Sequence, residues 1–156
     1  MQYAHKKIDV TDFHGALLDI ISVMNHPQRD EALLAAANVK LDQALFPLLV
    51  TIGRYSPSGV VELADRLGRD YTTVSRQVKR LEALGLAQKQ PAERDKRISE
   101  VTLSEQGKAL THSIDDARQT LMNRIFAGWP EEEISELFRL VRKYADVVKK
   151  ETPSGE

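Results

Sequence analysis

Apolar and polar positions repeat with helical spacing over two neighbouring stretches in the middle of the chain, residues 60–67 and 71–84. In the first stretch apolar side chains recur every three or four positions, and Gly68 stands where a helix ends. In the second stretch Asp70, a preferred N-cap residue, precedes a single apolar stripe. The pattern therefore predicts two short helices joined by a tight turn.

Two predicted β-strands follow the second helix. Gly85 ends that helix, residues 86–90 are predicted as one strand, and residues 98–103 alternate apolar and polar side chains as a second strand. The connection between the strands, residues 91–97, is polar and basic. Two short helices followed by a basic hairpin are the order of a winged helix-turn-helix, a module that binds DNA.

The second helix carries a polar face between its apolar anchors. An α-helix fits the major groove, where Arg can bond guanine, Gln can bond adenine, and Ser or Thr suits either base. A solvated surface with ordinary charges is the alternative interpretation of such a face. The DNA contacts predicted on this helix are Thr72, Thr73, Ser75, Arg76, Gln77, Lys79 and Arg80.

The tip of the hairpin is the second predicted DNA contact, through Arg94, Asp95, Lys96 and Arg97. Arginine at such a tip can enter a narrow minor groove, where the negative potential is concentrated. A carboxylate facing phosphates is repelled, so we interpret Asp95 as a brace that pairs with a neighbouring arginine and orients Arg97. The alternative is an aspartate that only forms the turn.

Residues 73–86 (TVSRQVKRLEALGL) and 95–107 (DKRISEVTLSEQG) resemble the MarR family of bacterial transcriptional regulators. The resemblance runs from the helix-turn-helix through the wing into the next helix, and the flanking helices are similar in order and length. It implies that the helix around Ser75 and Arg76 enters the major groove and that Arg97 enters the minor groove. Asp95 matches the family's wing carboxylate. Ser104 stands where threonine is usual and keeps a capping hydroxyl.

The outer segments are predicted to be helical. Apolar residues follow the helical period over residues 10–24 until Pro27 interrupts it, and after a polar turn residues 32–37 form a short helical turn. Residues 41–52 are predicted as a helix with a kink before Pro47, or as a helix that starts near this proline.

Two longer helices complete the chain. Ser104 caps a helix that extends to Ile125, and Pro130 suits the first turn of the last helix. The acidic triplet at residues 131–133 lies at the positive end of that last helix, so we interpret it as helix-start chemistry rather than a metal or catalytic site.

The first and last helices are more apolar than a monomer of this size needs. In the resembling family these helices intertwine between two subunits, which implies a homodimer; a core within one chain is the alternative. The predicted dimer contacts are Phe13, Leu17, Ile134, Phe138, Val141 and Tyr144. We expect one unit over residues 1–156 that is mainly α with a small β-hairpin wing (α+β), with a helical dimerisation region (1–40 and 108–156) and a DNA-binding lobe (41–107).

Composition agrees with a cytoplasmic protein. The 156 residues are 42% hydrophobic, enough for a sizeable core, and no apolar run or leader indicates a membrane or secretion. The net charge is −1, but residues 69–97 hold eight cations and four anions, so this segment carries +4 and the remainder carries −5. This uneven distribution favours double-stranded DNA as the partner of one face.

Other function classes have little support in the sequence. There are no cysteines, no HExxH pair and no Gly-rich phosphate loop, so we expect neither an enzyme nor a cofactor. Two alternatives stay open: a metal-responsive regulator of the same fold, if His5, His14 and His112 converge in a dimer, and a winged-helix module that binds only protein. The second should lack exposed cations on the helix and wing.

We therefore interpret the sequence as a homodimeric repressor that binds a pseudo-palindromic operator and is released by a small ligand. The resemblance to the MarR family implies an aromatic or phenolic molecule as that ligand. A two-fold dimer places its second half-site about 34 Å along the duplex. Without cysteines, release cannot follow thiol oxidation. The sequence does not indicate which residues hold the ligand.

Overall fold

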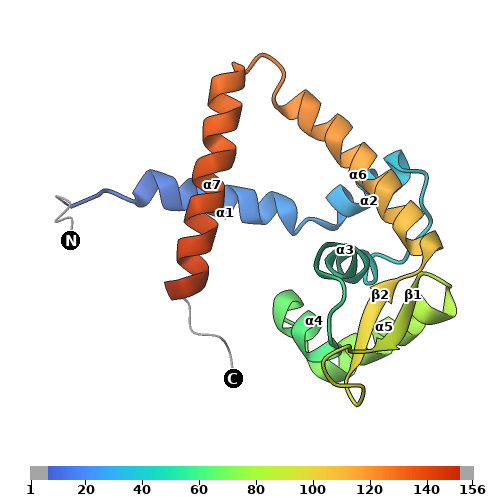
Figure 1. Cartoon of the computed structure of the whole chain (residues 1–156). Coiled ribbons are helices and arrows are strands. Elements are labelled where there is room, and N and C mark those ends of the chain that lie inside the picture. The colour runs from blue at the N-terminus through green and yellow to red at the C-terminus, as the bar shows by residue number, and fades with distance from the viewer. Residues whose placement is uncertain (1–6, 152–156) are drawn as a thin grey trace.

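The computed structural model describes residues 7–151, which form seven helices and one antiparallel β-hairpin (Figure 1). This is the predicted mainly α fold with a small β wing. The elements in chain order are α1 (Thr11–Met24), α2 (Pro27–Ala36), α3 (Phe46–Tyr55), α4 (Val60–Leu67), α5 (Tyr71–Ala83), β1 (Ala87–Pro91), β2 (Ser99–Leu103), α6 (Glu105–Ile125) and α7 (Glu131–Glu151).

One hydrophobic core holds α3, α4, α5, the hairpin and the first half of α6 together. Its fully buried side chains include Leu63 from the stripe predicted for α4 and Val74, Val78 and Leu81 from the stripe predicted for α5. Leu84, at the end of the second predicted stripe, is 53% exposed. The largest of them are Leu45, Leu48, Leu49, Ile52, Leu63, Val74, Val78, Leu81, Val101 and Ile114. In Figure 1 these elements form a lobe at one end, while α1 and α7 cross each other away from it and α6 connects the two regions.

The predicted end of α4, both ends of α5 and the predicted start of α6 are confirmed by their capping geometry. The Asp70 side chain accepts a hydrogen bond from the Thr73 amide at 2.8 Å, and the Ser104 hydroxyl accepts one from the Gly107 amide at 3.0 Å. Gly68 and Gly85 have φ angles of 63° and 75°, left-handed values that favour glycine and end α4 and α5. The sequence therefore encodes where the helix-turn-helix starts and stops.

The hairpin is also confirmed, with each strand starting one residue later than predicted. β1 pairs with β2 in a register that opposes Ala87 to Leu103 and Pro91 to Ser99. The sequence did not predict that Ser58, between α3 and α4, bridges to the other edge of β2. Its amide donates to the Val101 carbonyl at 3.2 Å, and the Val101 amide donates back at 2.7 Å. This bridge fixes the wing to the start of α4.

Two predictions for the N-terminal half are wrong. The kinked helix over residues 41–52 does not form: α3 starts at Phe46 with Pro47 in its first turn, as the alternative interpretation proposed. α2 starts at Pro27 and spans ten residues, rather than one turn over residues 32–37. Proline lacks an amide hydrogen and has a helical φ, so it suits the first turn of both helices. Burial of Leu33 and Leu34 anchors α2.

Candidate nucleic-acid interface

The polar face of α5 is held toward solvent because the opposite face is buried. Val74, Val78 and Leu81 are fully buried, which fixes the rotation of the helix about its axis. Thr72, Arg76, Lys79 and Arg80 are exposed, whereas Thr73, Ser75 and Gln77 are half-buried. Exposed cations on one helix face are suited to the edges of bases and to phosphates.

Three of the seven predicted contacts on α5 have partners within the chain. Thr73 Oγ1 donates to Asp70 Oδ2 at 2.7 Å as part of the N-cap. Gln77 Oε1 accepts from Arg69 Nη1 at 2.9 Å, and Arg80 Nη2 donates to Asp42 Oδ2 at 3.0 Å. The side chains of the other four, Thr72, Ser75, Arg76 and Lys79, form no hydrogen bond with any residue in the described range 7–151.

A short segment before α3 therefore supports the helix-turn-helix. Asp42 binds Arg80 on α5, and the Ala44 carbonyl accepts from Arg69 Nη1 at 3.1 Å in the turn between α4 and α5. Gln43, between them, donates to Glu31 Oε1 on α2 at 2.5 Å. Sequence reasoning missed this clamp, residues 42–44 with Arg69 and Arg80, because the partners lie up to 38 positions apart.

The wing tip confirms the predicted brace. Arg97 Nε donates to Asp95 Oδ1 and Nη2 donates to Oδ2, both at 3.1 Å, which is the two-pronged arrangement of an arginine with a carboxylate. The Arg97 amide also donates to Oδ1 at 3.0 Å, so Asp95 forms the turn as well. The Arg97 side chain is 91% exposed and held in one direction. Its guanidinium keeps the pKa of Asp95 below its usual value, so Asp95 stays charged.

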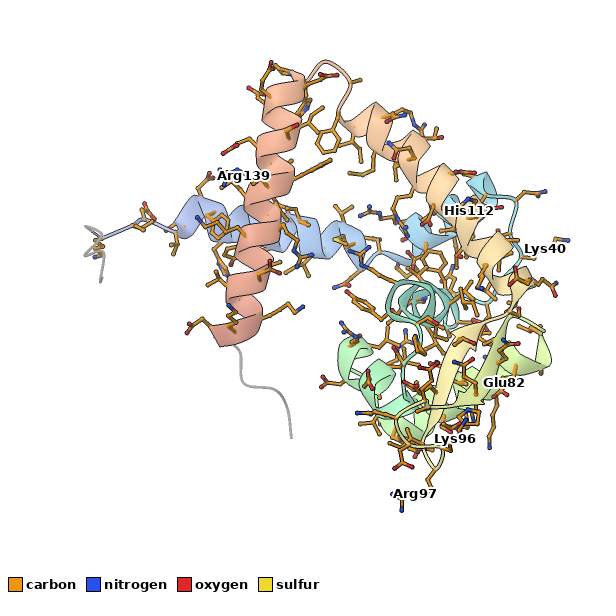
Figure 2. All side chains as sticks on the ribbon, in the orientation of Figure 1. Lys40, Glu82, Lys96, Arg97, His112 and Arg139 are labelled. Atoms are coloured by element: carbon orange, nitrogen blue, oxygen red, sulfur yellow. The ribbon has the colours of Figure 1, made fainter. Side chains whose placement is uncertain are left out.

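The wing cations lie at the far end of the lobe from α1 and α7. Figure 2 shows Lys96 and Arg97 at the hairpin tip, below the β-strands. Arg94 is exposed beside them. Lys89 on β1 forms an ion pair with Glu82 at the end of α5, at 3.8 Å, which links the wing to that helix. The geometry thus places two basic elements, the face of α5 and the wing tip, in one lobe that shares a hydrophobic core.

The predicted dimer residues lie on α1 and α7, and neither helix has a buried residue. Phe13 contacts Tyr144 edge to face, with ring centroids 5.2 Å apart, and Phe138 contacts Phe126 at 5.5 Å. The side chains of Phe13, Phe138, Val141 and Tyr144 are nevertheless 43–55% exposed, and those of Leu17 and Ile134 are half-buried. Within one chain these side chains are therefore only partly covered, and their place in a dimer contact stays a prediction.

The structure brings no metal-binding group together in a single chain. Within residues 7–151 no cluster of three or more His, Asp or Glu side chains is found, and His5 lies outside that range. His112 is on α6 (Figure 2) and His14 is on α1. Separately, no helix in the described part of the chain is both long and apolar enough to cross a membrane.

Comparisons with known proteins bear on the fold. A family model described as HVO_A0114 matches residues 41–101, which contain α3, α4, α5 and most of the hairpin. No curated protein matches the chain.

Solved structures match nearly the whole chain. A MarR family protein from Bacillus stearothermophilus is 21% identical with a TM-score of 0.76, covering 92% of this chain and 99% of that one. FabT from Streptococcus pneumoniae, in complex with DNA, is 17% identical with a TM-score of 0.68, covering 92% and 100%. The PcaV transcriptional regulator from Streptomyces coelicolor, in complex with its natural ligand, is 19% identical with a TM-score of 0.57, covering 92% and 99%. These matches confirm the resemblance at the level of the fold.

Proposed function

We propose that this chain is a MarR-type transcriptional regulator that binds a pseudo-palindromic DNA site as a homodimer, represses transcription and is released by a small ligand. The observation that carries the proposal is the pairing of the exposed cations of α5 with an arginine braced at the wing tip. Helix α5 and the hairpin both belong to the lobe that lies away from the crossing of α1 and α7 (Figure 1). The same exposed cations weigh against a winged helix that contacts only protein.

Each element has a distinct role in this proposal. Arg76 reads a base edge in the major groove, and Lys79 contacts a phosphate. Arg97 enters the minor groove beneath the wing, with its direction set by Asp95. Gln77 and Arg80 are hydrogen-bonded within the chain, so their first role is to position α5. Their side chains contact DNA only if those hydrogen bonds break.

The homodimer follows from the apolar surface that a single chain leaves open. Large apolar side chains line α1 and α7 at about half exposure, which a second copy covers when the same helices meet about a two-fold axis. One recognition helix contacts too few bases to select a site in a genome. Two lobes read half-sites about 34 Å apart, one turn of the duplex.

Ligand release rests on the chemistry of the chain and on the relatives. PcaV was solved with its natural ligand and FabT with DNA, so this fold accommodates both kinds of partner. A chain without cysteine cannot form a sulfenate or a disulfide, so we expect reversible binding of an aromatic or phenolic molecule rather than thiol oxidation. We expect the protein to act on DNA in the cytoplasm, without catalysing a reaction and without a cofactor.

The proposal is tested by selecting bound duplexes from a random DNA pool with the purified protein. We expect one enriched pseudo-palindrome with half-sites one helical turn apart. Arg76→Ala should weaken binding by about 1 to 3 kcal/mol and relax the preference at one position in each half-site. Lys79→Ala should weaken binding to all sequences alike.

Lys40→Ala is the matched control, because Lys40 is an exposed lysine that projects from the loop between α2 and α3, far from the wing tip (Figure 2). It should bind as wild type does. A pool without an enriched site, or equal loss in the Lys40 and Lys79 variants, would contradict the proposal.

A further inference from the structure

The segment between α2 and α3 brings a carboxylate against the exposed polar face of α5. Asp42 Oδ2 accepts a hydrogen bond from Arg80 Nη2 at 3.0 Å, across 38 positions of the chain. Arg80 follows Arg76 by four positions, so the two side chains lie one helical turn apart on the same face. Within residues 7–151, Asp42 is the only carboxylate in ion-pair distance of Arg76, Lys79 or Arg80.

The place of Arg80 along α5 indicates which part of DNA it meets. The first residues of a recognition helix contact base edges, whereas its later turns pass the sugar-phosphate backbone at the edge of the groove. Arg80 is the tenth residue of α5, which has 13. Its expected partner is therefore a phosphate oxygen. A guanidinium binds phosphate and carboxylate oxygens in the same way, so Asp42 and the DNA backbone compete for one donor.

Asp42 is held in place independently of Arg80. Its Oδ1 accepts from the Ala44 amide at 2.9 Å, and the Ala44 carbonyl accepts from Arg69 at 3.1 Å. The bond from the Ala44 amide, followed by the bond from Arg80, keeps the pKa of Asp42 below its usual value. The Asp42 carboxylate is therefore charged and fixed, and Arg80 is the partner that can turn away.

The bond between Asp42 and Arg80 is of a kind that can exchange. It consists of one hydrogen bond, whereas Arg97 is bound to Asp95 through two side-chain nitrogens. The side chains of Arg80 and Asp42 are 54% and 49% exposed, and exposed ion pairs are weak because water and salt compete with them. A duplex presents many phosphates along one groove, so its attraction for Arg80 exceeds that of a single carboxylate.

We propose that Asp42 is an intramolecular competitor of the DNA backbone: its carboxylate occupies the Arg80 guanidinium in the free protein and must release it before Arg80 binds a phosphate. This inference rests on the DNA-binding part of the proposed function. The competition weakens binding to every sequence alike, because phosphate contacts carry no sequence information. Asp42 thus limits how strongly the protein holds DNA in general, whereas Arg76 selects the operator.

The experiment titrates the full chain against two fluorescent duplexes of equal length, the selected operator and an unrelated sequence, and measures anisotropy at one low salt concentration. Asp42→Asn removes the charge but keeps an oxygen that can accept from the Ala44 amide. It should bind both duplexes about two- to fivefold more tightly than wild type, which is the factor that an exposed ion pair contributes. Arg80→Ala should weaken both affinities, and unchanged affinities in that variant would overturn the proposal.

The double variant gives a result that a merely structural role of Asp42 would not produce. With Arg80→Ala already present, Asp42→Asn should give no further gain, because no guanidinium is left to release. A gain that persists in the double variant would show that Asp42 only repels phosphates from a distance. Weaker binding in Asp42→Asn alone would show that Asp42 only positions α5. Either result would overturn the proposal.

Asp115→Asn is the matched control. It removes the same charge from an exposed carboxylate that also binds an arginine at 3.0 Å, Arg118 on α6. Both affinities should stay at the wild-type value, and a gain equal to that of Asp42→Asn would assign the effect to net charge and overturn the proposal. Circular dichroism of each variant verifies that it is folded.

The unrelated duplex separates this inference from the function on which it rests. If wild type selects an operator but Asp42→Asn binds no more tightly, the competition is refuted and the proposed regulator stands. If wild type selects no operator, the proposed regulator fails, and the titrations with the unrelated duplex still decide whether Asp42 competes for Arg80. A wild-type protein that binds neither duplex at low salt refutes both.

Discussion

Gly107→Ala should destabilise the protein although alanine is the better helix former. Gly107 is buried in the first turn of α6, and a Cβ added there falls well inside van der Waals contact with the Leu86 carbonyl oxygen. The same Cβ lies 3.1 Å from the Leu86 carbonyl carbon and 3.4 Å from Leu103 Cβ. Leu86 resists displacement, because its carbonyl accepts from the Ser104 amide at 3.0 Å and its own amide donates to Leu81 at 2.9 Å.

The size of the effect follows from two opposing contributions. Overpacking a close-packed site costs about 1 to 3 kcal/mol, and a contact with fixed backbone belongs at the upper end of that range. Replacing glycine by alanine in a helix regains about 1 kcal/mol. We therefore expect the free energy of unfolding to fall by about 2 kcal/mol.

Urea unfolding followed by circular dichroism, at one fixed protein concentration, measures this change. The control is Gln106→Ala, an exposed neighbour on the same turn, which should stay within about 0.5 kcal/mol of wild type. If Gly107→Ala unfolds at the same urea concentration as the control, the close approach of α6 to Leu86 does not require glycine at position 107, which would refute the prediction.

Three further predictions concern the salt dependence of DNA binding, the pairing of Asp95 with Arg97 and the pH dependence of stability. If a dimer touches roughly 6 to 10 phosphates, DNA affinity should fall about 10³- to 10⁵-fold between 50 and 200 mM salt, and an affinity that does not depend on salt would contradict the basic face. Asp95→Asn should reproduce part of the loss of DNA affinity caused by Arg97→Ala and add nothing to it in the double variant; additive losses would show that Asp95 does not act through Arg97. Hydrogen bonds from the side chain and amide of Thr73 lower the pKa of Asp70 from its usual 3.8. The charged Asp70 carboxylate therefore stabilises the fold fully above pH 3.8, and this stabilisation is lost as the pH falls through the lowered pKa. The stability difference between wild type and Asp70→Asn should accordingly shrink in acid, and a difference constant down to pH 3 would exclude this titration.

The sequence alone determined the features of this protein that depend on neighbouring residues. The caps at Asp70 and Ser104, the left-handed glycines after α4 and α5 and the pairing of Asp95 with Arg97 each depend on residues within a few positions of one another. The hairpin pairs two strands that follow each other directly in the chain. Such contacts form almost independently of the rest of the chain, so residue type and spacing are sufficient to predict them.

Prediction failed where two local signals competed. Over residues 41–52 the apolar period favoured one long helix, whereas Pro47 favoured a helix start. The proline prevailed because it has no amide hydrogen to donate to the carbonyl of a preceding turn. The polar residues after Pro27 were predicted to form a turn, but they belong to α2, which the burial of Leu33 and Leu34 against the core stabilises.

Only the tertiary structure decided which polar side chains are engaged and which face solvent. Gln77 and Arg80 are residue types that often contact DNA, yet Gln77 is bound by Arg69 from the preceding turn and Arg80 is bound by Asp42 from 38 positions away. Ser58 joins the sheet as a bridge without any strand pattern of its own. The apolar positions of α1 and α7 were read from the sequence, but their exposure in a single chain depends on the direction in which α6 carries α7 away from the lobe. Contacts of this kind form only after distant segments have packed, because the free energy that orients them comes from the shared core rather than from the local sequence.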